Sequence, residues 1–357
     1  MSKIRGVYSP RELRQVNTFD SAKMEHLAVA EAFGVECGNK ATFDASESFI
    51  SGGVNANVTN LRNFLQGMVR ELTTVRKIDE LLGQVTIGNV EDEEVIQMIE
   101  ERTATAKAYA DGVDVPFTSY NLDYERRTIV RFVIGTKSDW LADKRIAASG
   151  GDPEQAKMSG AMTALEIARN EVGFSGYNSG ANKTYGFLND PNLPAYQTLP
   201  DGAGGAPEWS TKTFEERQKD VTLAISSLMV STGGNFDPSM DNFTFAVPLS
   251  VATTLTEVNA YGISIQKWIN ETYPKCRIIY VPQLDSANGG ANVFYMYVET
   301  MRSDSTDNGR VFDQLVVQKS MSIGRGQEIG GYKEGFVNAM AGALLKRPYG
   351  VYRATGM

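Results

Sequence analysis

Glycine gathers in two segments that could cradle a phosphate or a substrate. Residues 171–196, EVGFSGYNSGANKTYGFLNDPNLPAY, run out of an apparent helix, and residues 322–335 read SIGRGQEIGGYKEG. The second segment has Ile329 where the dinucleotide fingerprint G-x-G-x-x-G has its last glycine, and neither segment contains G-x-x-x-x-G-K-[ST] or G-x-S-x-G. We therefore predict a glycine-rich turn at 322–335 and a hinge after the helix in 171–196.

Carboxylates form the next group of residues that could do chemistry. The run EDEEVIQMIEE at 91–101 lacks the central glycine of an EF-hand loop, so we interpret it as a solvated charged face. A small-molecule enzyme built on this chain would have to use carboxylates such as Glu93, Glu94 and Asp190. A ligand-dependent rise in melting temperature across a panel of metabolites would favour that alternative.

Histidine and cysteine are too few for the commonest catalytic and metal-binding arrangements. The single histidine, His26, excludes a multi-histidine metal site and argues against Ser-His-Asp and Cys-His mechanisms. Cys37 and Cys276 lie far apart without metal-type spacing, which is typical of buried thiols in a reducing compartment. We therefore name no catalytic, cofactor-binding or metal-binding residue, and we expect no cofactor.

The composition is that of a folded soluble chain with room for two or more packed units. Of its 357 residues, 42% are hydrophobic and 22% are charged, and the net charge of -8 argues against a sequence-independent DNA-binding protein. The start, MSKIRGVYSPRELRQ, lacks an apolar signal core, so we expect no secretion. No window approaches 18 uninterrupted apolar residues, so we expect no membrane span.

One long helix has the clearest signals. In GGDPEQAKMSGAMTALEIARNEVGFSG, Asp152 is a predicted N-cap, Pro153 takes the first helical position, and Gly173 is expected to end the helix. This predicts a helix over 152–172. Small residues recur along one face, where we expect close packing against a sheet: Ala156, Gly160, Ala164 and Ala168.

The remaining elements alternate between strands and helices without βαβ regularity, so the predicted class is α+β. Thr213 and Glu216 have the spacing of a capping box, which predicts a helix over 213–234. The other expectations follow the chain in order: an irregular arm to about residue 60, a helix-like rhythm at 61–83, a long hairpin with a charged, exposed tip within 84–135, a loop at 201–213, strand-like runs at 242–257 and 275–284 flanking a helix-like 256–273, a strand at 293–298 with one buried face, a strand at 311–323 and a last strand pair within 342–355.

This order of elements resembles that of the major capsid proteins of tailed phages, whose fold is named after phage Hong Kong 97 and is shared by encapsulin shells. The stretch DGVDVPFTSYNLDYERRTI (111–129) precedes the long helix, GYNSGANKTYGFLNDPNLP (176–194) follows it, and RPYGVYRATG (347–356) closes the chain. The resemblance covers the chain from about residue 84 to its end. It implies a Hong Kong 97-type fold and a non-enzymatic, self-assembling protein.

The resemblance also implies a division into domains. Residues 1–82 would be the N-arm and 83–135 the extended E-loop. Residues 136–213 and 311–357 would form the peripheral domain with its spine helix, and 214–310 the axial domain. Because only a short arm precedes residue 61, the scaffolding protein is expected to be separate or absent.

The resemblance further implies partners and a location. The chain would form pentamers and hexamers of an icosahedral shell around double-stranded DNA held without sequence-specific contacts, with scaffolding, portal and decoration proteins as further partners. It would be part of the virion, assembled in the host cytoplasm. Some relatives join an E-loop lysine to a neighbour's asparagine. Lys107 is the sole lysine in 83–135 and Asn338 is a conceivable partner, but we carry over no catalytic residue.

Two alternatives stay open at this point. An encapsulin-type compartment would share the fold but enclose an enzyme cargo, so a cargo-binding interior groove would favour it. The small-molecule enzyme with carboxylate chemistry is the alternative from a different class. Electron microscopy of the purified protein separates the shell proteins from the enzyme.

Overall fold

The computed structural model describes residues 75–108, 115–148, 151–302 and 305–357. They all belong to one compact unit, which begins at Leu72. The predictions for the arm, for His26 and Cys37 and for most of the helix-like rhythm at 61–83 lie outside the described residues.

Helices and strands are both abundant in the described residues, and the α+β prediction is confirmed. The helices are α3 (Ile78–Leu82), α4 (Trp140–Ala148), α5 (Pro153–Ser175), α6 (Phe214–Ser231), α7 (Ala252–Thr256) and α8 (Ile265–Thr272), with single 3-10 turns η2 (Leu249–Val251), η3 (Pro282–Leu284) and η4 (Pro348–Gly350). The strands are β1 (Gln84–Thr86), β2 (Glu94–Thr103), β3 (Ser119–Thr128), β4 (Val130–Asp139), β5 (Gln197–Thr198), β6 (Phe243–Pro248), β7 (Cys276–Val281), β8 (Val293–Val298), β9 (Phe312–Glu328), β10 (Gly331–Leu345) and β11 (Val351–Thr355).

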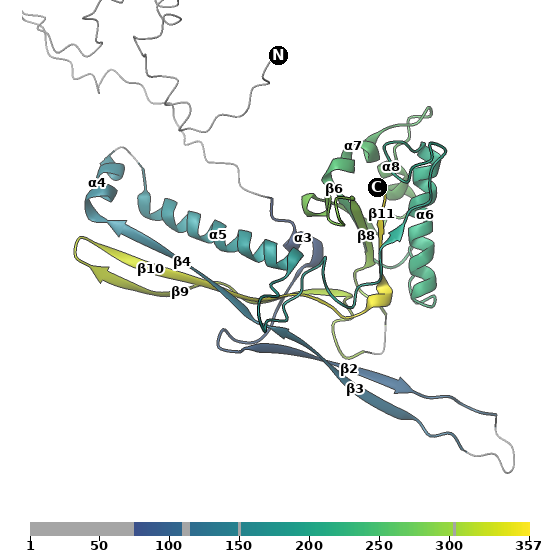
Figure 1. The fold of residues 1–357 in the computed structure, drawn as a ribbon, viewed down its shortest axis with the longest axis horizontal. Coiled ribbons are helices and arrows are strands. Elements are labelled where there is room, and N and C mark those ends of the chain that lie inside the picture. Colours follow the sequence, from purple (N-terminus) through teal and green to yellow (C-terminus); the bar gives the residue numbers. More distant parts are fainter. Residues whose placement is uncertain (1–74, 109–114, 149–150, 303–304) are drawn as a thin grey trace, which may run out of the picture. The chain divides into compact units, whose positions relative to one another are not determined.

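A four-stranded sheet in the order β1-β9-β10-β4 carries the long helix α5, which lies along it in Figure 1. Phe336 of β10 packs against Ala161 and Leu165 of α5, and Phe132 and Ile134 of β4 add to this contact. One face of the sheet is therefore covered by the helix through apolar side chains.

The start of α5 is as predicted, but its end is not. Asp152 accepts a hydrogen bond from the backbone N–H of Gln155, and Pro153 begins the helix. The helix continues through Gly173 to Ser175, and Gly176, with φ of 70°, is its C-cap. A Cβ on Gly173 would lie 2.5 Å from Ile78, so this glycine makes room for α3 instead of ending the helix.

The predicted role of the small-residue face of α5 is wrong for the subunit. Ala156 and Gly160 are exposed, and Gly160 has no heavy atom within 4 Å of its would-be Cβ. The sheet is contacted by the neighbouring face, through Ala161 and Leu165 with Met162 beside them, because leucine and methionine bury more apolar surface than alanine and glycine can.

A five-stranded sheet in the order β5-β11-β8-β6-β7 forms the larger core, with α6 beside it (Figure 1). All six residues of β8 are buried, because β8 is the central strand and both faces of the sheet are covered. The prediction of one buried face for VFYMYV was therefore wrong. The capping box of α6 is confirmed by reciprocal hydrogen bonds between Thr213 and Glu216.

Three sequence expectations near this sheet need correction. The run 242–257 is a strand only to Pro248 and then turns helical in η2 and α7. The helix-like 256–273 is a helix only in α8, because Asn259 caps a tight turn with its side chain. The last strand pair does not pair with itself: β10 lies in the four-stranded sheet, whereas β11 pairs with β8.

The expected long hairpin is confirmed as β2 and β3, which pair antiparallel from Glu94 opposite Thr128 to Thr103 opposite Ser119. Part of its tip, residues 109–114, lies outside the described residues. The glycine-rich segment 322–335 is not a long turn. It is the end of β9 and the start of β10, joined at Ile329 and Gly330.

The segment after α5 is a packed junction and not the predicted hinge. A Cβ on Gly186 would lie 2.4 Å from the carbonyl oxygen of Phe174, and one on Gly342 of β10 would lie 2.2 Å from that of Tyr185. Phe187, which follows directly, is fully buried in the larger core. The glycines let three backbone segments cross at close range, which fixes the chain where a hinge would have to move.

Candidate functional site

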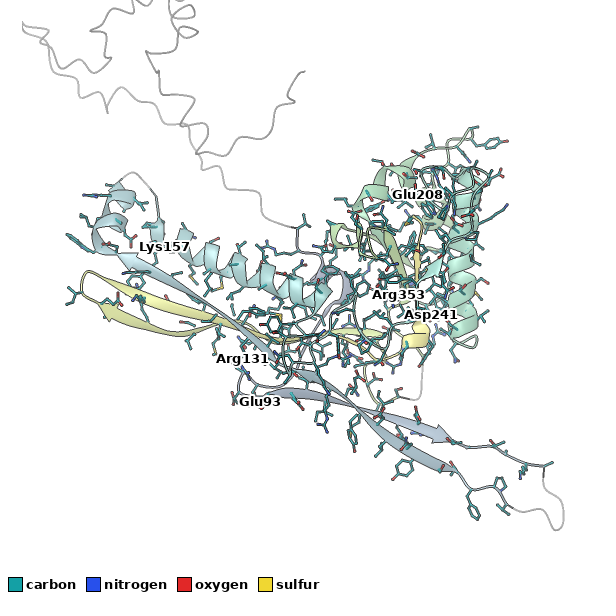
Figure 2. The ribbon with its side chains drawn as sticks, viewed as in Figure 1. Glu93, Arg131, Lys157, Glu208, Asp241 and Arg353 are labelled. Carbon is teal, nitrogen blue, oxygen red and sulfur yellow. The ribbon has the colours of Figure 1, made fainter. Side chains whose placement is uncertain are left out.

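The carboxylates named as enzyme candidates do not converge on a catalytic site. Glu93 and Glu94 are exposed at the root of the β2–β3 hairpin, where Glu93 is labelled in Figure 2. Asp190 is buried and pairs with Arg127, whose Nη2 lies 2.8 Å from Asp190 Oδ2. Burial raises the pKa of the Asp190 carboxyl above its ordinary value, although Arg127 opposes this. These three residues therefore give no support to the enzyme alternative.

The lysine and asparagine considered for a cross-link have very different surroundings. Lys107 is exposed, in the segment that follows β2. Asn338 is 1% exposed in the four-stranded sheet, and its side-chain amide donates to the carbonyl oxygen of Leu165 at 2.9 Å. An amine from a neighbouring subunit could reach Asn338 only if α5 moved off the sheet, so the structure argues against this link.

The glycine-rich segments form no phosphate cradle, because their glycines are explained by close backbone crossings and by a strand connection. An open groove of about 520 Å³ lies elsewhere, between the β2–β3 hairpin and the segments 305–307 and 344–349. The basic residues at its edge, Lys346 and Arg347, are already ion-paired with Asp307. Among the described residues, no group of three or more His, Cys, Asp or Glu side chains is placed to hold a metal ion. None of the described helices is long and apolar enough to cross a membrane.

What stands out instead is one face of the β2–β3 hairpin. In an antiparallel pair, residues directly opposite each other share a face, and successive residues alternate. Met98 lies opposite Tyr124, and Ile96, Leu122 and Tyr120 share their face. All five are exposed; Met98 is 64% exposed. We call this set, Ile96, Met98, Tyr120, Leu122 and Tyr124, the apolar hairpin face.

The opposite face of the hairpin is mostly polar beyond its root, with half-buried Ile99 as its one apolar side chain. Gln97, Glu101, Asn121 and Asp123 occupy it. A water-exposed hairpin is expected to place its apolar side chains toward a core, yet here the described residues of the same subunit leave these side chains 45–69% exposed. The contrast between the two faces predicts that a partner covers the apolar one.

The four-stranded sheet has an uncovered face of its own, opposite α5. Val133 is 68% exposed there, and Ile323 lies over Gly335, whose would-be Cβ is 3.2 Å from Ile323 Cδ1. Lys137 of β4 and Lys333 of β10 lie directly opposite each other in the strand register and share this face. It is thus a second apolar surface with basic residues beside it. We call it the open sheet face.

Two buried ion pairs lie elsewhere in the subunit, one at the root of the hairpin and one beside α6. Arg127 and Asp190 join the hairpin to the junction after α5. Lys212 and Asp220 lie 2.7 Å apart beside α6, where Trp209 also donates to Asp220 at 2.9 Å. Burial raises the pKa of Asp220 as it does that of Asp190. Pairing of these charges could not be deduced from the sequence, because the partners are 63 and 8 residues apart with no shared motif.

The comparisons with known proteins agree with this picture. A family model described as the Pa193 gp26 major capsid protein matches residues 49–356. The chain therefore belongs to the Pa193 gp26 major capsid protein family. No curated protein sequence matches the chain.

Solved structures show the same fold at low sequence identity. The capsid of Myoviridae phage XM1 has a TM-score of 0.65 at 13% identity and covers 86% of this chain and 100% of its own. The capsid of a native GTA particle has a TM-score of 0.55 at 12% identity and covers 86% of this chain and 99% of its own. Mycobacterium phage Ogopogo has a TM-score of 0.54 at 9% identity, covering 82% and 96%. The predicted Hong Kong 97-type capsid fold is confirmed, and the chain is a structural capsid protein of tailed-phage type.

Proposed function

We propose that this chain assembles into pentamers and hexamers of an icosahedral shell that encloses double-stranded DNA. The observation that carries the proposal is the apolar hairpin face, which the subunit leaves open to water. Burying an apolar side chain of this size stabilises a contact by about 1.5–3 kcal/mol when burial is complete. Five such side chains, each already partly covered, supply several kcal/mol per subunit contact, and a closed shell repeats that contact around every axis.

The open sheet face of a second subunit is the proposed surface that covers the apolar hairpin face. Both surfaces present apolar side chains on β-structure, and on the open sheet face Ile323 lies over Gly335, which is paired with Gly135. Lys137 and Lys333 on the open sheet face both pair with Glu328, and Glu94 and Glu100 on the hairpin pair with Arg126 and Arg102, so both surfaces carry balanced charges. The two surfaces are thus matched in hydrophobicity between two copies of one chain.

The proposed domain division follows from the resemblance. Two of its boundaries can be compared with the strands of the structure. Residue 135, the end of the proposed E-loop, lies inside β4, so the hairpin and the four-stranded sheet share a strand. The proposed peripheral domain includes β11, which pairs with β8 of the proposed axial domain. The two domains are therefore tied by hydrogen bonds as well as by sequence.

The proposed partners beyond the subunit itself are the DNA and other virion components. The net charge of -8 is compatible with a shell that encloses DNA without binding it through basic side chains. A separate scaffolding protein, a portal and decoration proteins complete the proposed set. Assembly in the host cytoplasm and incorporation into the virion follow from this function, and we propose no enzymatic activity.

Electron microscopy and sedimentation of the purified full-length chain test the proposal with a matched pair of variants. Leu122→Asp introduces an aspartate on the apolar hairpin face. Asn121→Asp introduces an aspartate at the neighbouring position, on the opposite face of the hairpin. We expect shells or capsomers from the wild type and from Asn121→Asp, and dispersed subunits from Leu122→Asp. Dispersed wild-type subunits under every assembly condition would contradict the function. Equal assembly of both variants would contradict only the role of the hairpin face.

A further inference from the structure

Helix α4 has no buried residue, although it is only nine residues long. Helices shorter than about 12–15 residues are marginal in water unless one face packs against other parts of the structure. Its side chains are anchored at Asp143, which accepts from Lys157 Nζ at 2.7 Å and from the hydroxyl of Ser138. Trp140 and Leu141 remain 64% and 47% exposed. We therefore expect α4 to be covered by a surface that the described residues of its own subunit do not supply.

The side of α4 turned away from Asp143 is both apolar and basic. At about 3.6 residues per turn, four exposed side chains gather on that side. We call this set, Leu141, Lys144, Arg145 and Ala148, the basic helix face. Lys157 pairs with Asp143, whereas no described residue forms an ion pair with either cation of the basic helix face. Two copies of this face would bring like charges together, so the matching surface is one that carries carboxylates.

The segment that leads from β1 into β2 carries the longest run of carboxylates in the chain, EDEE at 91–94, which we call the acidic turn. Glu91 and Glu93 are exposed, and neither forms an ion pair with a described residue. Arg131 lies at the acidic turn, but its Nε donates to the carbonyl oxygen of Val90 at 2.7 Å and not to a carboxylate. The acidic turn therefore has carboxylates that are free to pair with another molecule.

The other cations at this corner leave an excess of negative charge. Arg126 lies 4.0 Å from Glu94, and Lys183 is held nearby through its backbone N–H, which donates to Thr128 Oγ1 at 3.1 Å. With Arg131 they are three cations against the four carboxylates of the acidic turn. A further basic group is therefore attracted to this corner.

One subunit holds the basic helix face and the acidic turn apart. The N–H of Ile129 donates to the carbonyl oxygen of Glu93 at 2.8 Å, so the acidic turn lies at the start of β4. Helix α4 follows the other end of β4, ten strand residues later, which is roughly 30 Å away at the usual rise of an extended strand. Figure 1 shows α4 at that far end, and Figure 2 labels Glu93 at the near one. The two surfaces can therefore meet only between different copies of the chain.

We propose that the basic helix face of one copy of the chain docks on the acidic turn of a second copy. The cations of the basic helix face pair with Glu91 and Glu93. Leu141 packs against Ile87 and Val90, which are half-buried beside the acidic turn. Because the two surfaces differ, each copy gives one and receives the other, and the contact repeats from copy to copy until a shell closes.

Charge reversal in the full-length chain tests this contact, with assembly measured by sedimentation and electron microscopy. The helix variant carries Lys144→Glu and Arg145→Glu, the turn variant carries Glu91→Lys and Glu93→Lys, and the exchanged variant carries all four substitutions. We expect the helix and turn variants each to need at least about tenfold more protein to assemble, because like charges then face each other. The exchanged variant should return to within about threefold of the wild type, because opposite charges face each other again. An exchanged variant that assembles no better than the other two would overturn the contact.

The exchanged variant has the net charge of the wild type, so a second variant separates pairing from net charge. It combines the two turn substitutions with Lys219→Glu on α6 and Lys275→Glu before β7, both exposed lysines outside the proposed contact. Its net charge is also that of the wild type, but its assembly should stay as poor as that of the turn variant. Recovery equal to that of the exchanged variant would mean that overall charge, and not pairing, controls assembly, and would overturn the contact.

Trp140 provides a measurement that does not depend on charge. It is exposed, whereas Trp209 is buried and Trp268 is half-buried. Docking of α4 removes the Trp140 ring from water, so assembly should shift the fluorescence emission of the wild type to shorter wavelength. Trp140→Phe should lose most of that shift. Wild-type shells with unshifted emission would show that α4 stays uncovered, which contradicts the contact.

This contact rests on the proposed function, but the two can fail separately. Shells that form equally well from the wild type, the helix variant and the turn variant would refute the contact alone. Wild-type subunits that associate only into small complexes, with the same loss and recovery across the variants, would refute the shell alone. Subunits that never associate would refute both.

Discussion

The β2–β3 hairpin and the five-stranded sheet are both rich in apolar side chains, but they complete their packing in different ways. In β8, Phe294, Met296 and Val298 alternate with tyrosines, and all six residues are buried within the subunit. In the hairpin, Met98 and Tyr124 face each other across the strands and remain exposed. The apolar side chains of the sheet are buried within the subunit, whereas those of the hairpin are exposed on one face. We therefore expect a neighbouring subunit to cover that face.

The two regions should therefore differ sharply when apolar side chains are removed. Phe245→Ala in β6 deletes a fully buried ring that packs edge-on against Phe294. We expect the free energy of unfolding to fall by about 3–5 kcal/mol, because the ring leaves a cavity that the sheet cannot close. Urea unfolding of dispersed subunits measures it, and a loss below about 1 kcal/mol would contradict a closed core.

A smaller effect is expected at the junction that connects the two regions. Gly342→Ala adds a Cβ 2.2 Å from the carbonyl oxygen of Tyr185 at a residue with φ of 76°. We expect a loss of about 2–4 kcal/mol in the same unfolding measurement, from backbone strain and from the clash.

Gly289→Ala separates the two causes. Gly289 also has positive φ, at 59°, but nothing lies within 4 Å of its would-be Cβ. Its loss should stay near about 1 kcal/mol, from backbone strain alone. Equal losses at Gly342 and Gly289 would show that the junction yields, as a hinge would.

The start of α6 offers a local effect of moderate size in the closed region. Thr213→Ala removes the hydroxyl that accepts from the N–H of Glu216, and we expect a loss of about 1 kcal/mol. Thr213→Ser keeps the hydroxyl and should restore most of it. A loss in the alanine variant that serine does not restore would mean that the methyl group matters more than the cap.

The smallest effect on the subunit is expected from the hairpin. Tyr124→Ser removes a large apolar side chain that is half exposed, so the unfolding free energy of dispersed subunits should change by less than about 0.5 kcal/mol. The same variant should assemble less readily in sedimentation, since the ring would be buried between subunits. A large loss in the dispersed subunit would instead place Tyr124 in a core of its own subunit.

Local signals in the sequence were dependable where their partners lie close along the chain. Asp152 with Gln155, and Thr213 with Glu216, are three residues apart, so their side chains and backbone N–H groups must meet if a helix forms at all. The hairpin and the α+β class followed from similar short-range patterns. The resemblance to tailed-phage capsid proteins rested on the order of those elements and is confirmed.

Predictions failed where a distant segment decided the outcome. Gly173 was predicted to end the helix because glycine often follows the last helical residue. Instead it is a glycine because the side chain of Ile78 occupies the space where a Cβ would lie. The small-residue face of α5 looked like a packing surface, yet larger side chains next to it, such as Leu165, contact the sheet. Asp190 was named as a candidate carboxylate for an enzyme, but in the fold it is buried and forms an ion pair with Arg127.

By itself the sequence determined where the capped helices α5 and α6 begin, because each cap joins residues three positions apart, and the resemblance to tailed-phage capsid proteins supplied the arrangement of elements. Only the tertiary structure decided which face of each element meets a neighbour. VFYMYV was expected to have one buried face, yet β8 is covered on both sides, whereas the apolar hairpin face is open. Burial depends on what lies across from a strand, and for the hairpin that surface belongs to another copy of the chain in the shell we propose.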